Sequence, residues 1–310
     1  MRRRWALLMC LAGFAGPNAW ALAGGESAGA ILKVGMGGRP AALGEAYSAL
    51  GDDVFAAGYN PAALGRGSGI ELGVQHAIWF EQSSVEFAGI AIPLEGRRQG
   101  LGLSALLFRS GELNRTLEDP AGGYDASRSV GTFITSTLVV AGGYAIERGS
   151  VRLGVGVKVL RDQVDADTVY SGATDIGGQA EPWKGVRLGA SVLNLGGSLG
   201  TNSLPGVFRT GLAYERIPGL SVPIEVLLLP VDGSQLKLAG GIEYRPWPWA
   251  ALRVGGRTGD PIVPSGGAGL DIGGFRLDYA YASFSTALRE AHRISLSYRL
   301  GATPERHGEE

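Results

Sequence analysis

The chain has 310 residues, a formal net charge of −1 and 18% charged residues. It contains 52 glycines and only three histidines, whereas average usage is about 7% glycine and about 25% charged residues. A net charge near zero produces no field that would attract nucleic acid, so no nucleic-acid partner is expected. No stretch after residue 23 approaches a transmembrane helix, and the apolar residues mostly alternate instead.

Residues 1–23 have the three-part layout of a secretory signal peptide. Three arginines precede an apolar run over residues 5–14, and small residues follow up to residue 23. A membrane anchor is the rival interpretation, but spanning a bilayer takes about 20 apolar residues. Lipidation at Cys10 is rejected because Met9 occupies a position where a lipoprotein signal usually has a small residue. Removal of the signal peptide leaves no cysteine, so the mature chain has neither disulfides nor cysteine nucleophiles.

Residues 24–68 differ from the rest of the chain because their apolar residues follow helical spacing. Leu43, Ala46, Tyr47 and Leu50 fall at this spacing and predict a short helix. The pair Asp52-Asp53 is suited to cap a second turn through Ala57. Asn60-Pro61 then forces a turn, because proline pushes the preceding residue out of the helical region. We interpret this segment, called the hatch below, as a small plug that leads into a barrel.

Residues 69–300 show period-two alternation typical of β-strands. In the last strand, Ile294, Leu296 and Tyr298 share one face while arginines and serines share the other. A secreted sandwich or solenoid would show similar alternation, but transmembrane strands need about 9–11 residues, and the segments found here have about that length. Fourteen such segments occur: 69–80, 83–94, 100–108, 130–146, 151–165, 172–182, 186–196, 207–217, 221–232, 234–246, 249–258, 264–272, 275–284 and 290–300.

The even strand number and the connections favour an outer-membrane barrel over a soluble β protein. Single-chain bacterial barrels have even strand numbers, with short periplasmic turns and longer outside loops. The short turns here are 95–99, 147–150, 183–185, 218–220 and 273–274, and most of the other connections are longer. The first hairpin and the one near 232–234 are short on the supposed outside, against this pattern. The predicted fold is therefore an all-β, antiparallel transmembrane β-barrel of about fourteen strands with a small N-terminal helical hatch in the lumen.

Aromatic residues and glycines add two further expectations. Aromatic side chains near strand ends suit a membrane interface, although each is equally suited to a core or a turn: Trp79, Phe80, Tyr144, Tyr244, Trp247, Trp249 and Tyr298. Glycines on the inward face are expected to make room in the lumen for the hatch.

The hatch sequence resembles the N-terminal signature of the PorV/PorQ family, which is related to FadL-type fatty acid transporters. The matching residues are Gly37-Gly38-Arg39-Pro40-Ala41-Ala42-Leu43-Gly44-Glu45-Ala46-Tyr47, then Asp52-Asp53, then Tyr59-Asn60-Pro61-Ala62-Ala63-Leu64. Tyr59 stands where the family often has Trp, the last strand ends on Leu300 instead of Phe, and a tail over 301–310 follows.

The resemblance implies a fourteen-stranded barrel whose N-terminal segment sits in the lumen. It implies a location in the outer membrane of a Gram-negative-type (diderm) bacterium, with outer-membrane lipid and the barrel-assembly machinery as partners. The hatch residues that it implies are Gly37, Gly38, Arg39, Leu43, Gly44, Tyr47, Asn60, Pro61 and Ala62.

Two functions follow from the resemblance, and the sequence leaves both open. FadL-type relatives pass hydrophobic small molecules, for which the chain offers the apolar hatch residues Leu43, Tyr47, Leu50 and Phe55. It also offers a set of lumen-facing arginines able to hold a carboxylate: Arg152, Arg187, Arg253, Arg276 and Arg293. The alternative for these arginines is pairing with Asp271, Asp278 or Glu243 inside the barrel. Other relatives serve type IX secretion as shuttle or scaffold proteins. A secreted protein would then bind the outside loops, above all 109–129, whose alternative interpretation is a solvated, mobile loop.

Catalytic and metal-binding patterns are weak. His76, His292 and His307 are not at the spacing of metal ligands on a helix, and no Gly-x-Ser-x-Gly elbow occurs. Gly35-x-Gly37 lacks a third glycine and follows no strand, so it is a poor dinucleotide signature. We expect no enzyme activity, no catalytic residues, no metal and no cofactor.

Overall fold

The computed structural model describes residues 28–67, 69–79, 82–94, 98–119, 123–230, 235–258, 262–283 and 291–301, with side chains omitted over 117–129. The signal peptide predicted over 1–23 lies outside the described residues, and so does the tail after Gly301.

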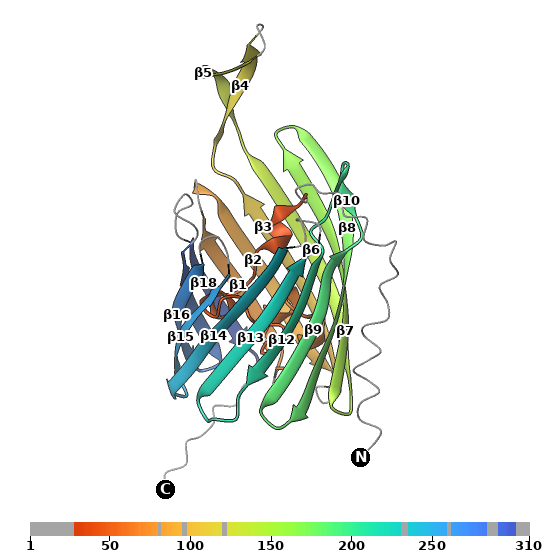
Figure 1. Cartoon of the computed structure of the whole chain (residues 1–310), viewed down its shortest axis with the longest axis vertical. Coiled ribbons are helices and arrows are strands. Elements are labelled where there is room, and N and C mark those ends of the chain that lie inside the picture. Colours follow the sequence, from red (N-terminus) through yellow and green to blue (C-terminus); the bar gives the residue numbers. More distant parts are fainter. Residues whose placement is uncertain are drawn as a thin grey trace.

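Fourteen antiparallel strands form one closed barrel, in which β1 pairs with β18 to complete the wall (Figure 1). Each predicted strand has its counterpart, and the predicted fold class is confirmed. The wall consists of β1 (Glu71–Ile78), β2 (Ser84–Leu94), β3 (Gln99–Arg109), β6 (Thr135–Arg148), β7 (Val151–Val164), β8 (Asp167–Trp183), β9 (Val186–Leu195), β12 (Val207–Tyr214), β13 (Leu220–Leu229), β14 (Gln235–Trp247), β15 (Ala250–Arg257), β16 (Val263–Ile272), β17 (Phe275–Ala282) and β18 (Ala291–Arg299).

Alternation along each strand separates an apolar outer face from a more polar inner face, because successive side chains point to opposite sides of a sheet. On β7, Leu153 and Val157 are 56% and 63% exposed, whereas Arg152 and Lys158 are buried. Trp247 and Trp249 stack near the β14–β15 turn with ring centroids 5.3 Å apart. Trp79 instead packs against Phe108 beside an interior cluster.

The hatch occupies the lumen as four short helices joined by turns: η2 (Ala30–Lys33), α1 (Gly38–Ala42), η3 (Ala56–Gly58) and η4 (Pro61–Ala63). The helix predicted over residues 43–50 is wrong. The α-helix ends at Ala42 because Gly44 and Glu45 both adopt positive φ, at 66° and 69°. Asp53 accepts a hydrogen bond from the Phe55 amide at the predicted second turn, just before η3. None of the helices in the described part of the chain is long and apolar enough to cross a membrane.

A two-stranded ribbon replaces most of the loop predicted over 109–129. β4 (Leu113–Asp119) pairs with β5 (Gly123–Phe133), and the ribbon projects beyond one end of the barrel (Figure 1). We call this the ribbon end, and the end with the β6–β7 turn the turn end. A smaller hairpin, β10 (Ser198–Leu199) and β11 (Asn202–Ser203), lies between β9 and β12 in the chain.

Candidate functional site

The Asn-Pro-Ala element fastens the hatch to β7, β8 and β9. Asn60 is fully buried, and its side-chain nitrogen donates to the carbonyls of Ser48 and Gly178 at 3.0 and 2.9 Å. Its side-chain oxygen accepts from the Ala62 amide at 3.0 Å, which caps η4. A Cβ at Gly177 would lie 2.0 Å from this oxygen, so the glycine is needed for the close approach. The expected role of inward glycines is confirmed here.

The Gly-Gly-Arg element fastens the other half of the hatch to the last strands. The Gly38 amide donates to the Ser295 hydroxyl at 2.9 Å, and Arg293 donates to the Gly37 carbonyl at 3.3 Å. Gly44 approaches the wall so closely that a Cβ would lie 2.2 Å from the Gly256 carbonyl oxygen. Leu43 and Tyr47 are fully buried. All nine hatch residues selected from the sequence therefore lie inside the barrel, where they contact the wall or other hatch residues.

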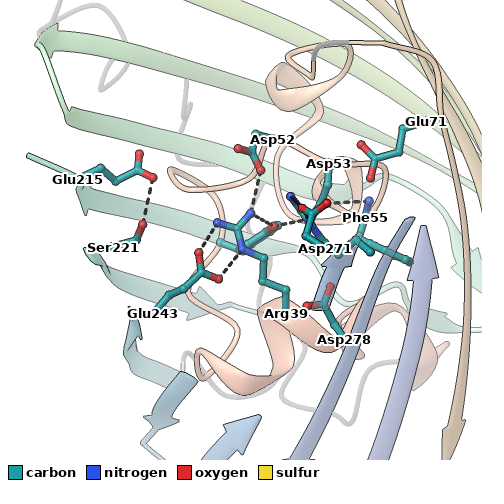
Figure 2. A network of polar contacts seen from close by, with 12 residues as sticks. Arg39, Asp52, Asp53, Phe55, Glu71, Glu215, Ser221, Glu243, Asp271 and Asp278 are labelled. Atoms are coloured by element: carbon teal, nitrogen blue, oxygen red, sulfur yellow. Dashed lines mark hydrogen bonds and ion pairs between the residues drawn. The ribbon is translucent and has the colours of Figure 1, made fainter. Parts of the chain in front are cut away.

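Arg39 is the centre of a buried polar network between the hatch and the wall (Figure 2). Its Nε and Nη2 donate to the two carboxylate oxygens of Glu243 on β14 at 2.8 and 2.9 Å. Its Nη1 donates to Asp52 at 2.8 Å and to the Tyr47 hydroxyl at 3.1 Å. A two-pronged arginine–carboxylate pair fixes orientation as well as charge. Arg39 thus joins α1, the Asp52 turn and β14.

The network shifts the acidity of the hatch carboxyls in opposite directions. Burial alone would raise the pKa of Asp52, but the Arg39 charge overcomes this effect and holds that pKa below its usual range. Burial, together with the nearby Glu71 and Asp52 charges, raises the pKa of Asp53 to about 6. Asp53 accepts from the Tyr47 hydroxyl at 2.6 Å. One carboxyl of this adjacent pair is therefore held ionised, while the other changes its charge near neutral pH.

The five arginines predicted to face the lumen all do so, and each has an acidic partner. Arg253 pairs with Glu243 and Asp278, and Arg276 pairs with Asp271, as the alternative interpretation predicted. The other three pairs are Arg152 with Glu147, Arg187 with Glu215, and Arg293 with Glu45. Contact between these arginines and a ligand stays a prediction.

The inner face of the wall from β1 to β8 is apolar near the ribbon end. Inward side chains on these strands pack against Ile31, Val54 and Phe55 of the hatch: Ala77, Val85, Phe87, Leu106, Val139, Leu160 and Ala173. Of the apolar hatch residues expected to matter for transport, only Phe55 belongs to this cluster. Leu43, Tyr47 and Leu50 form a separate one. One sequence feature could have predicted an apolar inner wall: over residues 85–94, side chains on both faces of the strand are largely apolar.

A cavity of about 40 Å³ lies between the hatch and this apolar wall. Met36, Val54 and Phe87 line it on the inside, and Leu103 and Val157, which face outward, also border it. The wall here is thin because Gly102, Gly142, Gly143 and Gly156 carry no side chains. Of the lining residues that the structure describes, the charged ones are Lys158 and Asp175. Among the described residues, no group of three His, Cys, Asp or Glu side chains is arranged to hold a metal ion.

The closed fourteen-stranded barrel has the same class of fold as solved structures of toluene transporters and of a FadL homologue. The toluene transporter TbuX of Ralstonia pickettii superposes with a TM-score of 0.60 at 15% identity, covering 86% of this chain and 98% of the transporter. The toluene transporter TodX of Pseudomonas putida gives 0.61 at 12% identity, covering 85% and 96%. A FadL homologue of Pseudomonas aeruginosa gives 0.60 at 13% identity, covering 85% and 98%. At these identities the likeness concerns the fold.

The family is established by sequence. The family model described as "Uncharacterised protein family (UPF0164)" matches residues 23–180, just over half of the chain, and the chain belongs to this family. A comparison with curated proteins found no match.

Proposed function

We propose that the chain is a PorV/PorQ-type, FadL-like barrel of the outer membrane of a diderm bacterium that binds or passes hydrophobic small molecules. The ribbon end would face outward and the turn end the periplasm. Outer-membrane lipid would surround the apolar outer face, and the barrel-assembly machinery would insert it. The protein would act without catalysis.

The observation that carries this proposal is the apolar inner wall beside the hatch. The interior of a membrane barrel is ordinarily polar, so inward Phe87, Leu106 and Leu160 are unusual there. Phe87 also lines a cavity that the hatch bounds on one side and that borders outward-facing Leu103 and Val157. Ligand pockets typically measure about 300–1,000 Å³. A ligand larger than the present 40 Å³ cavity therefore requires Met36 and neighbouring hatch residues to move.

The structural neighbours support the same class of ligand. TbuX and TodX are described as toluene transporters, and toluene is an uncharged hydrocarbon. An apolar cavity favours such a molecule because each square ångström of apolar surface removed from water contributes about 25 cal/mol. Toluene is therefore the first ligand to test.

The test is calorimetric binding of toluene to protein extracted from outer membranes in detergent, with heat-modifiable gel mobility to verify the folded barrel. Saturable binding is expected for the wild type. Phe87→Glu places a charge on the cavity wall and should abolish binding while the barrel still forms. Val130→Glu, on the exposed ribbon, is the matched control and should bind normally. A folded wild-type barrel that takes up no toluene would refute the proposal.

A second function, a non-catalytic shuttle or interaction barrel for type IX-like protein secretion or surface assembly, is favoured by the β4–β5 ribbon. The ribbon is a separate sheet outside the barrel, anchored at its base by the ion pair between Arg115 and Asp165. Replacing residues 114–132 with a short turn should leave heat-modifiable mobility intact and remove a secreted partner from pull-downs. If the same proteins co-purify with and without the ribbon, this second function has no support from the ribbon.

A further inference from the structure

The two charged residues that line the cavity, Lys158 and Asp175, form a closed set of contacts with Asn194. Lys158 on β7 and Asp175 on β8 are 7% and 3% exposed, and Lys158 Nζ lies 2.8 Å from Asp175 Oδ2. Lys158 also donates to the Asn194 side-chain oxygen at 2.6 Å. The Asn194 amide donates to Asp175 Oδ1 at 2.8 Å. Both charges are therefore held by partners that belong to the wall.

Local backbone geometry shows that this arrangement is built into the wall. Asn194 has a φ of 61°, and the register of β8 against β9 shifts between Thr174 and Ile176. This bulge turns the Asn194 amide toward Asp175, since a bulge re-aims groups that a regular ladder would pair across strands. The Asn194 side chain also donates to the Pro205 carbonyl at 3.0 Å. The position of Asn194 is thus fixed from both sides.

The charges that line the cavity set the electrostatic cost of binding a charged ligand there. Within the described part of the chain, the lining contains one cation, Lys158, and one anion, Asp175, so these lining residues carry no net charge. A ligand carboxylate would need an unneutralised cation, because burying an unpaired charge is costly. Lys158 is already neutralised, and Asp175 beside it would repel the carboxylate, strongly so where water is excluded.

We propose that the Lys158–Asp175 pair makes this cavity selective for uncharged apolar molecules and against carboxylates, with Asp175 as the specificity-determining residue. This inference rests on the proposed function. It assigns to the wall a neutral ligand class, in contrast to the carboxylate that a set of lumen arginines would hold.

Toluene and benzoate provide a matched pair of probes, because they share one ring and differ in a methyl group against a carboxylate. Wild-type protein is expected to bind toluene at least tenfold more tightly than benzoate. In Asp175→Asn the side chain keeps its shape and an acceptor for the Asn194 amide, while Lys158 loses its counter-ion. Benzoate affinity should then rise at least tenfold, because the ligand supplies the missing negative charge.

Two further variants separate this effect from a general disturbance of the wall. The double variant Lys158→Met/Asp175→Asn has no cation and should show no gain in benzoate affinity. Arg161→Gln changes an exposed cation on the same strand, three residues from Lys158, and should leave both affinities as in the wild type. Heat-modifiable mobility of every variant verifies the fold.

The possible results distinguish a failure of the proposed ligand specificity from a failure of the proposed binding function. Wild-type protein that binds benzoate as tightly as toluene overturns the specificity, even if Asp175→Asn does not fold. Toluene binding without a benzoate gain in a folded Asp175→Asn variant also overturns it and leaves the proposed function standing. Binding of neither probe by the wild type refutes the proposed function and the specificity with it.

Discussion

Arg39 links three parts of the molecule that are far apart in the chain, and its partner Glu243 lies 204 residues away. Glu243 also accepts from Arg253 and Arg245, so one buried carboxylate serves three arginines. The sequence predicts Arg39 in the hatch and Glu243 as a possible partner of the lumen arginines. The Arg39–Glu243 pair could not be predicted, because period-two alternation gives the face of the sheet on which a strand residue lies but not its height along the barrel.

Arg39→Met should loosen the hatch while leaving the barrel closed. Removing one partner of a buried ion pair typically costs about 3–5 kcal/mol, and the lower end is expected because Glu243 keeps two other arginines. Hydrogen exchange should show reduced protection over residues 38–53 and unchanged protection in the strands. Arg245→Gln, which removes a more exposed partner of the same carboxylate, is the control and should have a smaller effect.

Asp53 should make the hatch more stable in mild acid. Because its pKa is raised to about 6 in the folded state, the folded hatch binds more protons than the unfolded one between pH 4 and 6, and stability falls as the pH rises through this window. The difference between pH 5 and pH 7.5 is about 1 kcal/mol.

The measurement is amide protection in the hatch at these two pH values. Asp53→Asn should remove most of the pH dependence. Greater protection at pH 7.5 than at pH 5 in the wild type would have the wrong sign for this mechanism.

At the scale of elements, the hatch packs closely against the wall at a pair of glycines, Gly154 and Gly177, which we call the glycine track. Gly154 and Gly177 on neighbouring strands leave space for Pro61, Ala62 and Asn60, and a Cβ at Gly154 would lie 2.3 Å from the Ala62 amide nitrogen. The contacts are with backbone or with a fully buried side chain, which has no room to move away. The wall and the Asn-Pro-Ala element are therefore fitted to each other.

Gly177→Ala should displace the Asn60 turn, because the new methyl group would overlap the Asn60 side-chain oxygen. Overpacking of this kind typically costs about 1–3 kcal/mol. Gly178→Ala is the matched control on the next residue, where the nearest atom to a Cβ is a Leu153 methyl carbon 3.6 Å away. Thermal loss of the heat-modifiable band should occur at lower temperature for the first variant only. Equal midpoints for both variants would show that the glycine track does not constrain the hatch.

The strands were predictable from the sequence and the hatch helix was not, for a physical reason. A barrel strand has one apolar and one more polar face, so alternation marks it, and β7 and β18 follow this pattern. The hatch is enclosed on all sides, so apolar residues at 43, 46, 47 and 50 are buried without forming one helical face. The ribbon strands escaped prediction because residues 113–133 carry no sustained alternation of apolar and polar residues.

At the scale of the whole molecule, the barrel wall is complete without the hatch. Each wall strand pairs with two others, and β1 and β18 close the ring directly. The hatch adds contacts to the inner face only. The segment that occupies the lumen therefore contributes no strand to the wall.

Deleting residues 28–67 should leave a barrel that still shifts on heating and conducts ions in planar bilayers. The full chain should conduct far less, because the hatch and its ion pairs occupy much of the lumen. Conductance is the readout, and Arg39→Met provides an intermediate case with a loosened hatch. If the deletion variant inserts and folds but conducts no more than the full chain, segments other than the hatch block the lumen.

The docking of Gly38 on Ser295 has a consequence for biogenesis. The hatch precedes the whole wall in the chain, yet its seat includes a hydroxyl and an arginine from β18, the last strand in the described part of the chain. The hatch therefore has no complete binding surface until the final strand has arrived. A polypeptide interrupted before β18 would carry a hatch that is docked through the Asn-Pro-Ala element but not through β18, together with an open seam at β1, and both would be more accessible to proteases.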